Sequence, residues 1–97
     1  MTELRVVAEI AAKPGSEDGI RSALSTLAVA TRDEDGCVSY EVFESEAAPG
    51  TFFTIETWRS PEDMATHLQT EHLAAAFAAA DGHVSVPPAI HPLIPVG

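Results

Sequence analysis

The stretch from residue 52 to residue 72 constrains the fold most, because it marks a strand, a helix start and a helix in succession. Residues 52–58 are mostly aromatic or β-branched, which is typical of a pleated strand. Ser60 is a preferred helix N-cap, Pro61 suits the first helical position, and Asp63 follows the cap by three residues. The sequence therefore predicts a strand that turns through a well-marked cap into a helix.

The two faces of this strand differ in character, since successive side chains of a strand point to opposite sides. We interpret one face as simple core: Phe53, Ile55 and Thr57. The other face holds Phe52, Thr54, Glu56 and Trp58. A carboxylate two residues from an indole is something that a plain core face seldom needs. This second face is therefore the first candidate for a functional site.

The rest of the chain adds three strands and one helix. Apolar and polar residues alternate in residues 4–12 and 37–44, and a weaker strand with prolines is expected near residues 89–96. Between the first two strands, Ser16 caps a helix that is expected to stop at Gly36. The order βαββαβ predicts an α+β, ferredoxin-like fold, with a four-stranded antiparallel sheet and its helices on one face.

The helix after Ser60 carries two apolar stripes that one straight helix cannot bury together. At about 100° per residue, the stripes lie nearly opposite each other. One contains Met64, His67, Leu68, Glu71 and His72, and the other contains Leu73, Ala76, Phe77 and Ala80. We therefore predict a break between Gln69 and His72, with Thr70 as the cap of a second helical piece that ends at Asp81 and Gly82.

Large apolar side chains occur on both faces of the predicted sheet, although the helices cover only one. The two sets are Leu4, Val6, Tyr40, Val42, Phe52 and Trp58, and Val7, Phe43, Phe53 and Ile55. A bare apolar face of this size needs a cover, and an identical subunit is the commonest one. We expect a homodimer in which two sheets pack face to face and leave a pocket in each subunit.

The composition of the chain argues against some classes of binding partner. The 97 residues predict a single domain, 1–97, and the net charge of −10 argues against nucleic acid and anionic membrane surfaces. No run of about 20 apolar residues is present, so we expect a cytoplasmic protein. The single cysteine, Cys37, allows no intrachain disulfide and is expected to be a small buried residue.

Glu56, Trp58, His67 and Tyr40 are the candidate site residues, because the predicted fold brings the strand face near the following helix. Together they would form a base, an aromatic wall and hydrogen-bonding groups in one pocket. The alternative is a purely structural role for all three residues. In that case Trp58 packs in the core, Glu56 makes a local cap or bridge, and His67 is a structural histidine whose hydrogen bonds are made within the protein. On a regular helix, His67 and His72 point about 140° apart, and only the predicted break would bring them together as metal ligands. We expect no metal and, without a glycine-rich phosphate loop or dinucleotide fingerprint, no bound cofactor.

The segment E-T-W-R-S-P-E-D-M-A-T-H-L-Q-T-E-H-L, with Lys13-Pro14-Gly15 and residues 36–41, resembles the antibiotic biosynthesis monooxygenase (ABM) family, which includes small quinol monooxygenases. The resemblance implies a dimeric ferredoxin-like domain. It also implies oxidation of phenolic, quinol-type or polycyclic aromatic molecules by dioxygen without metal or flavin. The haem-degrading branch uses an Asn, a Trp and a His, and this chain has no asparagine.

By this resemblance, His67 or Glu56 would be the base or its orienter, and the residues alone do not rank one above the other. Trp58 and Tyr40 would wall the substrate ring, and Phe52 and His72 are further candidates for substrate contact. The alternative function is a non-catalytic, dimeric small-molecule-binding or stress-associated domain of the same fold.

Overall fold

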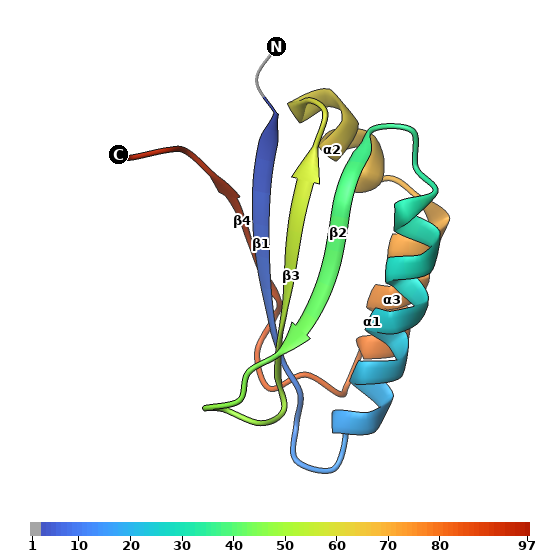
Figure 1. Cartoon of the computed structure of the whole chain (residues 1–97). Coiled ribbons are helices and arrows are strands. Elements are labelled where there is room, and N and C mark those ends of the chain that lie inside the picture. The colour runs from blue at the N-terminus through green and yellow to red at the C-terminus, as the bar shows by residue number, and fades with distance from the viewer. Residues whose placement is uncertain (1–2) are drawn as a thin grey trace.

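The structure, a computed structural model, describes residues 3–97 and confirms the predicted α+β, ferredoxin-like fold (Figure 1). In chain order the elements are β1 (Leu4–Ala11), α1 (Glu17–Arg32), β2 (Cys37–Glu44), β3 (Thr51–Trp58), α2 (Pro61–His67), α3 (Glu71–Ala80) and β4 (Ala89–Leu93). The strands form one antiparallel sheet in the order β2-β3-β1-β4. In this described part of the chain, no helix has both the length and the apolar character that crossing a membrane requires.

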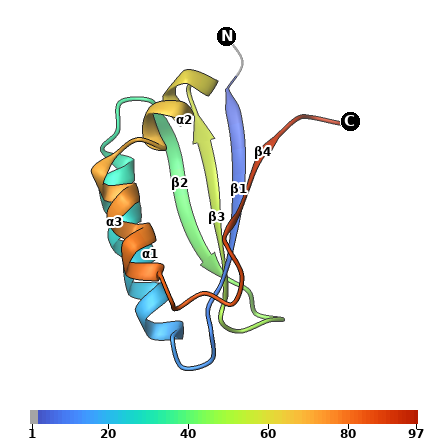
Figure 2. The ribbon, with the colours of Figure 1, turned by 180° about the vertical axis from the view of Figure 1, so that it is seen from behind.

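The helices α1 and α3 lie side by side on one face of the sheet, and both views leave the other face uncovered (Figures 1 and 2). The short helix α2 sits at the end of β3. Because paired residues of antiparallel strands point to the same side, the register shows which side chains share the helix-covered face. It carries the largest buried apolar and aromatic side chains of the sheet: Val6, Ile10, Tyr40, Phe52 and Trp58.

The interpretation of Phe53, Ile55 and Thr57 as simple core was wrong. They lie on the uncovered face, where Ile55 is 48% exposed, and the buried face of β3 is the one with Glu56. Alternation shows that the two faces differ, but both contain large apolar groups, and only the position of the helices decides which face they cover.

The predicted helix break is confirmed. The helix α2 ends at His67 and α3 begins at Glu71. Ser60 caps α2 by accepting a hydrogen bond from the Asp63 amide at 3.2 Å, and Thr70 caps α3 by accepting one from the Leu73 amide at 3.3 Å. The break lets each piece bury its own apolar side, so the two stripes no longer compete.

Several predicted boundaries need correction. The strand β4 ends at Leu93 rather than residue 96, and β1 ends at Ala11, with Ala12 forming an isolated bridge to Val84. Ser16 precedes α1 as predicted, but its side chain makes no cap hydrogen bond. Its hydroxyl instead lies 3.0 Å from Nδ1 of His83.

Gly36 does not stop α1 by a left-handed conformation, as was expected. The helix already ends at Arg32, and Gly36 has no positive φ. A Cβ at this position would come closer than 3.0 Å to the Cβ, Cγ and Oδ1 atoms of Asp63 in α2. Gly36 is therefore needed for the close approach of the 33–36 loop to α2.

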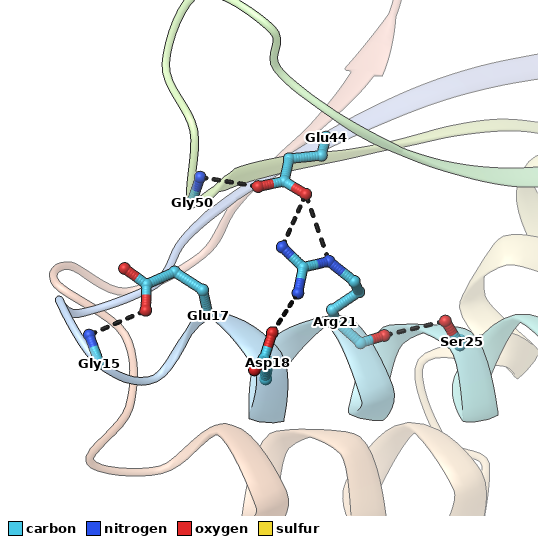
Figure 3. Close-up of polar contacts among 7 residues, drawn as sticks. All are labelled: Gly15, Glu17, Asp18, Arg21, Ser25, Glu44 and Gly50. Carbon is cyan, nitrogen blue, oxygen red and sulfur yellow. Dashed lines mark hydrogen bonds and ion pairs between the residues drawn. The ribbon is translucent and has the colours of Figure 1, made fainter.

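Arg21 ties the start of α1 to the connection between β2 and β3 (Figure 3). Its guanidinium donates to Glu44 at 2.8 and 3.2 Å and also pairs with Asp18. The second oxygen of Glu44 accepts the Gly50 amide at 3.0 Å. The hydrogen bonds from Arg21 and then from Gly50 lower the pKa of Glu44, so this carboxylate stays charged and the tie stays intact at neutral pH.

Candidate functional site

Glu56 is a buried carboxylate on the helix-covered face of β3, and its neighbours on that face satisfy it. Its side chain accepts a hydrogen bond from the Thr54 hydroxyl at 2.5 Å and one from the indole N–H of Trp58 at 2.9 Å. Glu56 is 3% exposed and Trp58 is fully buried. Each carboxylate oxygen therefore has a donor from the same strand, which fixes the group in one orientation.

His67 lies over this pair because it is the last residue of α2, which packs against the end of β3. It is 2% exposed, and its ring centroid is 4.6 Å from that of Trp58 and 6.0 Å from that of Tyr40. The helix cap at Ser60 sets where α2 begins, and the break after His67 sets where it ends. Local signals that the sequence already contains thus position this imidazole.

Tyr40 stands opposite Glu56 in the register of β2 and β3. It is 3% exposed. Burial, and then the negative charge of Glu56, raise the pKa of Tyr40 well above its usual value of 10.0. The phenol therefore keeps its proton at any ordinary pH and is not available as a base.

A cavity of about 60 Å³ lies between the covered face of the sheet and the helices. Its polar lining comes only from residues of the candidate site: Tyr40, Thr54, Glu56 and His67. The remaining walls are apolar, and they include Leu24, Leu73, Phe77 and Ile90. Phe77 is 46% exposed and Ile90 is 37% exposed, so the cavity reaches the surface between α3 and β4. The result is an apolar cavity with one polar end.

Glu34, in the loop between α1 and β2, completes the polar cluster from outside the cavity. Its Oε2 lies 2.6 Å from Nδ1 of His67 and 2.7 Å from Nε2 of His72. The side chains become more exposed along this series, from 3% for His67 to 12% for Glu34 and 28% for His72. Sequence reasoning missed Glu34 as a site residue, because it stands in a run of acidic residues with nothing local to single it out.

The chain is similar enough to known proteins to show the family to which it belongs. Residues 4–79 match the antibiotic biosynthesis monooxygenase family. This chain belongs to that family.

Relatives and solved structures agree with the ABM assignment. The chain is 30% identical over 91 residues to "Probable quinol monooxygenase YgiN" of Escherichia coli, covering 84% of this chain and 88% of that protein. It is 33% identical over 67 residues to "Putative monooxygenase Rv0793" of Mycobacterium tuberculosis, covering 69% and 65%. The solved structure of Rv0793 superposes with a TM-score of 0.90 at 27% identity and covers 99% of this chain and 97% of that one. The chain spans only 46% of a third relative, an uncharacterized protein of a Synechocystis strain, sll1783.

In this ABM protein the helix break brings His67 and His72 together around Glu34, and their ligand-type atoms all lie within 4.8 Å of one another. Two histidines and a carboxylate are a known metal-binding set. However, ligand atoms bound at about 2.1 Å to a tetrahedral ion lie about 3.4 Å apart. The 2.6 and 2.7 Å separations here are hydrogen-bond distances, so the cluster has the geometry of a hydrogen-bonded network.

The structure brings some of the expected ABM site residues together and separates one. Tyr40, Glu56 and His67 line the cavity, whereas Trp58 does not line it and instead donates a hydrogen bond to Glu56. Phe52 lies near the opposite end of β3, opposite Ile10 and under the Arg21 guanidinium at 5.4 Å. His72 does not line the cavity; its hydrogen bond is to Glu34, and its ring centroid is 6.1 Å from that of His67. Cys37 is partly buried and packs against the core. Burial is the main cause that raises the pKa of its thiol.

Proposed function

We propose that this ABM-family protein is a cofactor-independent monooxygenase that oxidises a phenolic, quinol-type or polycyclic aromatic molecule with dioxygen. The observation that supports this most is one apolar cavity whose single polar end contains an imidazole, a carboxylate and a protonated phenol. The chemistry of this lining suits an aromatic ring that carries a hydroxyl group. The family match and the names of its relatives supply the reaction class.

His67 is the base in this proposal, and Glu56 orients the substrate. Both oxygens of Glu56 already accept hydrogen bonds, from Thr54 and Trp58, which hold the carboxylate in one orientation as a fixed anchor. The Nδ1 edge of His67 is taken by Glu34, and its Nε2 has no hydrogen-bond partner among residues 3–97. Nε2 is therefore the nitrogen free to take a phenolic proton.

The chemistry needs no external reductant, because the substrate supplies every electron. Removal of a phenolic proton leaves an electron-rich anion that passes one electron to dioxygen, and the resulting radicals join through a new carbon–oxygen bond. For a hydroquinone, loss of the ring proton and cleavage of the O–O bond then give a hydroxyquinone and one water. One oxygen atom enters the product and the other leaves as water, so dioxygen takes up four electrons. The apolar walls protect the intermediates from solvent.

The uncovered face of the sheet suits a second copy of the chain. Its apolar side chains include Phe43, Ile55 and Leu93, which are 47%, 48% and 42% exposed. An apolar sheet face that no helix covers is the kind of surface that subunits bury against each other. We therefore propose a homodimer with the sheets face to face and one cavity per subunit.

The test of function is oxygen consumption with a panel of one-ring, two-ring and larger hydroquinones, with spontaneous oxidation subtracted. We expect turnover by the wild type, a large loss of kcat in His67→Ala, and weaker substrate binding in Glu56→Gln. His91→Ala, which alters a histidine on the uncovered face, should leave the rate unchanged. Full activity of His67→Ala would remove His67 from the mechanism.

The cavity volume favours a second candidate, a binding domain without turnover. Pockets for drug-sized ligands measure about 300–1,000 Å³, so a cavity of about 60 Å³ holds an aromatic ring only after side chains at its mouth move. A hydroquinone or quinone that perturbs Trp58 fluorescence saturably, with no oxygen consumed for any member of the panel, would establish the binding domain and exclude the monooxygenase.

A further inference from the structure

We propose that Glu34 is a positioning residue that fixes the tautomer of His67, with His72 bracing Glu34 from the solvent side. This inference rests on the proposed role of His67 as the base. It concerns a residue outside the cavity, in the 33–36 loop, that touches no substrate. The carrying observation is that one carboxylate oxygen, Oε2 of Glu34, meets a ring nitrogen of both histidines.

The tautomer follows from the chemistry of the partners. An ionised carboxylate only accepts hydrogen bonds, and a neutral imidazole carries its proton on one nitrogen alone. At 2.6 Å from Glu34, Nδ1 of His67 must therefore be the N–H donor. Nε2 then holds a lone pair. Because His67 lines the cavity and Glu34 does not, this lone pair is on the edge of the ring that is available to a substrate.

Without such a partner, the His67 ring would not be held in the tautomer that accepts a proton from the substrate. Free imidazole side chains exchange between the two tautomers, and the form with its proton on Nε2 would donate into the cavity instead of accepting. The same logic explains why a buried carboxylate behind the histidine of a serine protease is needed for the correct tautomer, and there its loss as an amide costs about 10⁴ in kcat. Glu34 is less buried, so a smaller effect is expected.

His72 explains why the Glu34 side chain stays in place although it sits in a loop. Its Nε2 lies 2.7 Å from the same oxygen, so the carboxylate is held between two imidazoles that come from different helices. The His67 and His72 ring centroids are 6.1 Å apart. The brace depends on the break between α2 and α3, since the two histidines point apart on an unbroken helix.

The first experiment reads the tautomer directly and needs no substrate. Long-range ¹H–¹⁵N NMR spectra distinguish protonated from unprotonated ring nitrogens, and His67→Ala assigns the resonances. We expect the wild-type His67 to be protonated at Nδ1. Glu34→Ala should lose this preference, and Glu34→Gln should lose or reverse it, because its amide N–H can donate to Nδ1 and stabilise the other tautomer. A wild-type ring protonated at Nε2, or an unchanged tautomer in Glu34→Ala, would overturn the proposal.

The second experiment measures activity with a hydroquinone that the wild type oxidises. Removal of a partner that orients a functional histidine costs roughly 10–100-fold in related settings. We expect kcat of Glu34→Ala to fall by about that factor with little change in KM, and Glu34→Gln to lose at least as much, because its amide can hold the wrong tautomer. Asp35→Ala is the matched control, because it removes a neighbouring carboxylate that is 96% exposed. A Glu34→Gln protein as active as the wild type would contradict a role that depends on the carboxylate.

Thermal unfolding of each variant separates positioning from folding, because a positioning effect appears in variants that melt like the wild type. The two proposals also fail separately. If no hydroquinone is oxidised by the wild type, the monooxygenase function fails, while the NMR result still decides whether Glu34 sets the tautomer. If the wild type is active and Glu34→Ala is equally active, only the role of Glu34 is lost.

Discussion

Replacing Gly36 by alanine tests whether the loop before β2 holds α2, and therefore His67, in position. The added Cβ overlaps three atoms of the Asp63 side chain. Asp63 has little freedom to yield: the Ser60 hydroxyl donates to it at 2.7 Å, and Arg59 donates to both its oxygens at 2.9 Å. Relief of the overlap must shift either the loop or the first turn of α2.

The size of the effect follows from two opposing contributions. Adding a methyl group to a tightly packed contact costs about 1–3 kcal/mol. Because Gly36 has no positive φ, alanine also reduces the entropy of the unfolded chain, which recovers about 0.4–1 kcal/mol. The net loss is about 1–2 kcal/mol, which lowers Tm by about 4–16 °C in a domain of this size.

Gly19 provides a matched control within the same chain. It lies inside α1, and a Cβ there meets nothing within 4 Å. Gly19→Ala should therefore stabilise the protein by about 0.5–1 kcal/mol, because alanine favours a helix interior. Thermal and urea unfolding of the two variants should give shifts of opposite sign. A Gly36→Ala protein as stable as the wild type would refute the close-packing argument. Asp63→Ala should not rescue it, since the Asp63 Cβ is itself one of the overlapped atoms.

Three further predictions use the same structure. Burial and the charge of Glu56 raise the pKa of Tyr40, so the folded state keeps a proton that the unfolded chain loses above pH 10.0; this stability is complete below that pH and falls as pH rises above it. The absorbance of the single tyrosine should show no tyrosinate near pH 10 while the protein is folded, and Tyr40→Phe should lose stability less steeply at alkaline pH. Ile55→Glu should yield monomers in light scattering, whereas Val29→Glu, at a 65% exposed position on α1, should leave the dimer intact, and a monomeric wild type would contradict the proposed interface. Trp58→Phe should cost about 1–3 kcal/mol in urea unfolding, because it removes one of two donors to the buried Glu56 carboxylate, and an unchanged midpoint would mean that this bond contributes nothing.

The sequence predicts the fold well wherever a local signal decides the structure. The cap at Ser60, the cap at Thr70 and the two opposed apolar stripes that follow Ser60 suffice to predict two helices rather than one. Alternation suffices to predict the strands and to group Glu56 with Trp58 on one face. What alternation does not decide is which face the helices cover, and that is why Phe53, Ile55 and Thr57 were misassigned.

Long-range contacts account for the parts of the site that the sequence does not reveal. Glu34 is separated from His67 by 33 residues and stands between two other acids, so its role depends entirely on how the loop meets α2. Phe52 was grouped with Trp58 because they share a strand face. A strand rises about 3.3 Å per residue, however, so the six residues between them place Phe52 roughly 20 Å from Trp58 along the strand. The alternating pattern of a strand shows which residues share a face, but it does not show how far apart they lie along the strand.

The three residues between α2 and α3, Leu68 to Thr70, make the spacing between the two histidines sensitive to chain length. One inserted or deleted residue would turn the start of α3 by about 100° and withdraw the imidazole of His72 from its carboxylate. It would also turn the α3 side chains that line the cavity, such as Leu73 and Phe77, out of their places in its wall. In this fold, therefore, the number of residues in one short connector governs both the hydrogen bond behind His67 and the shape of the cavity in front of it.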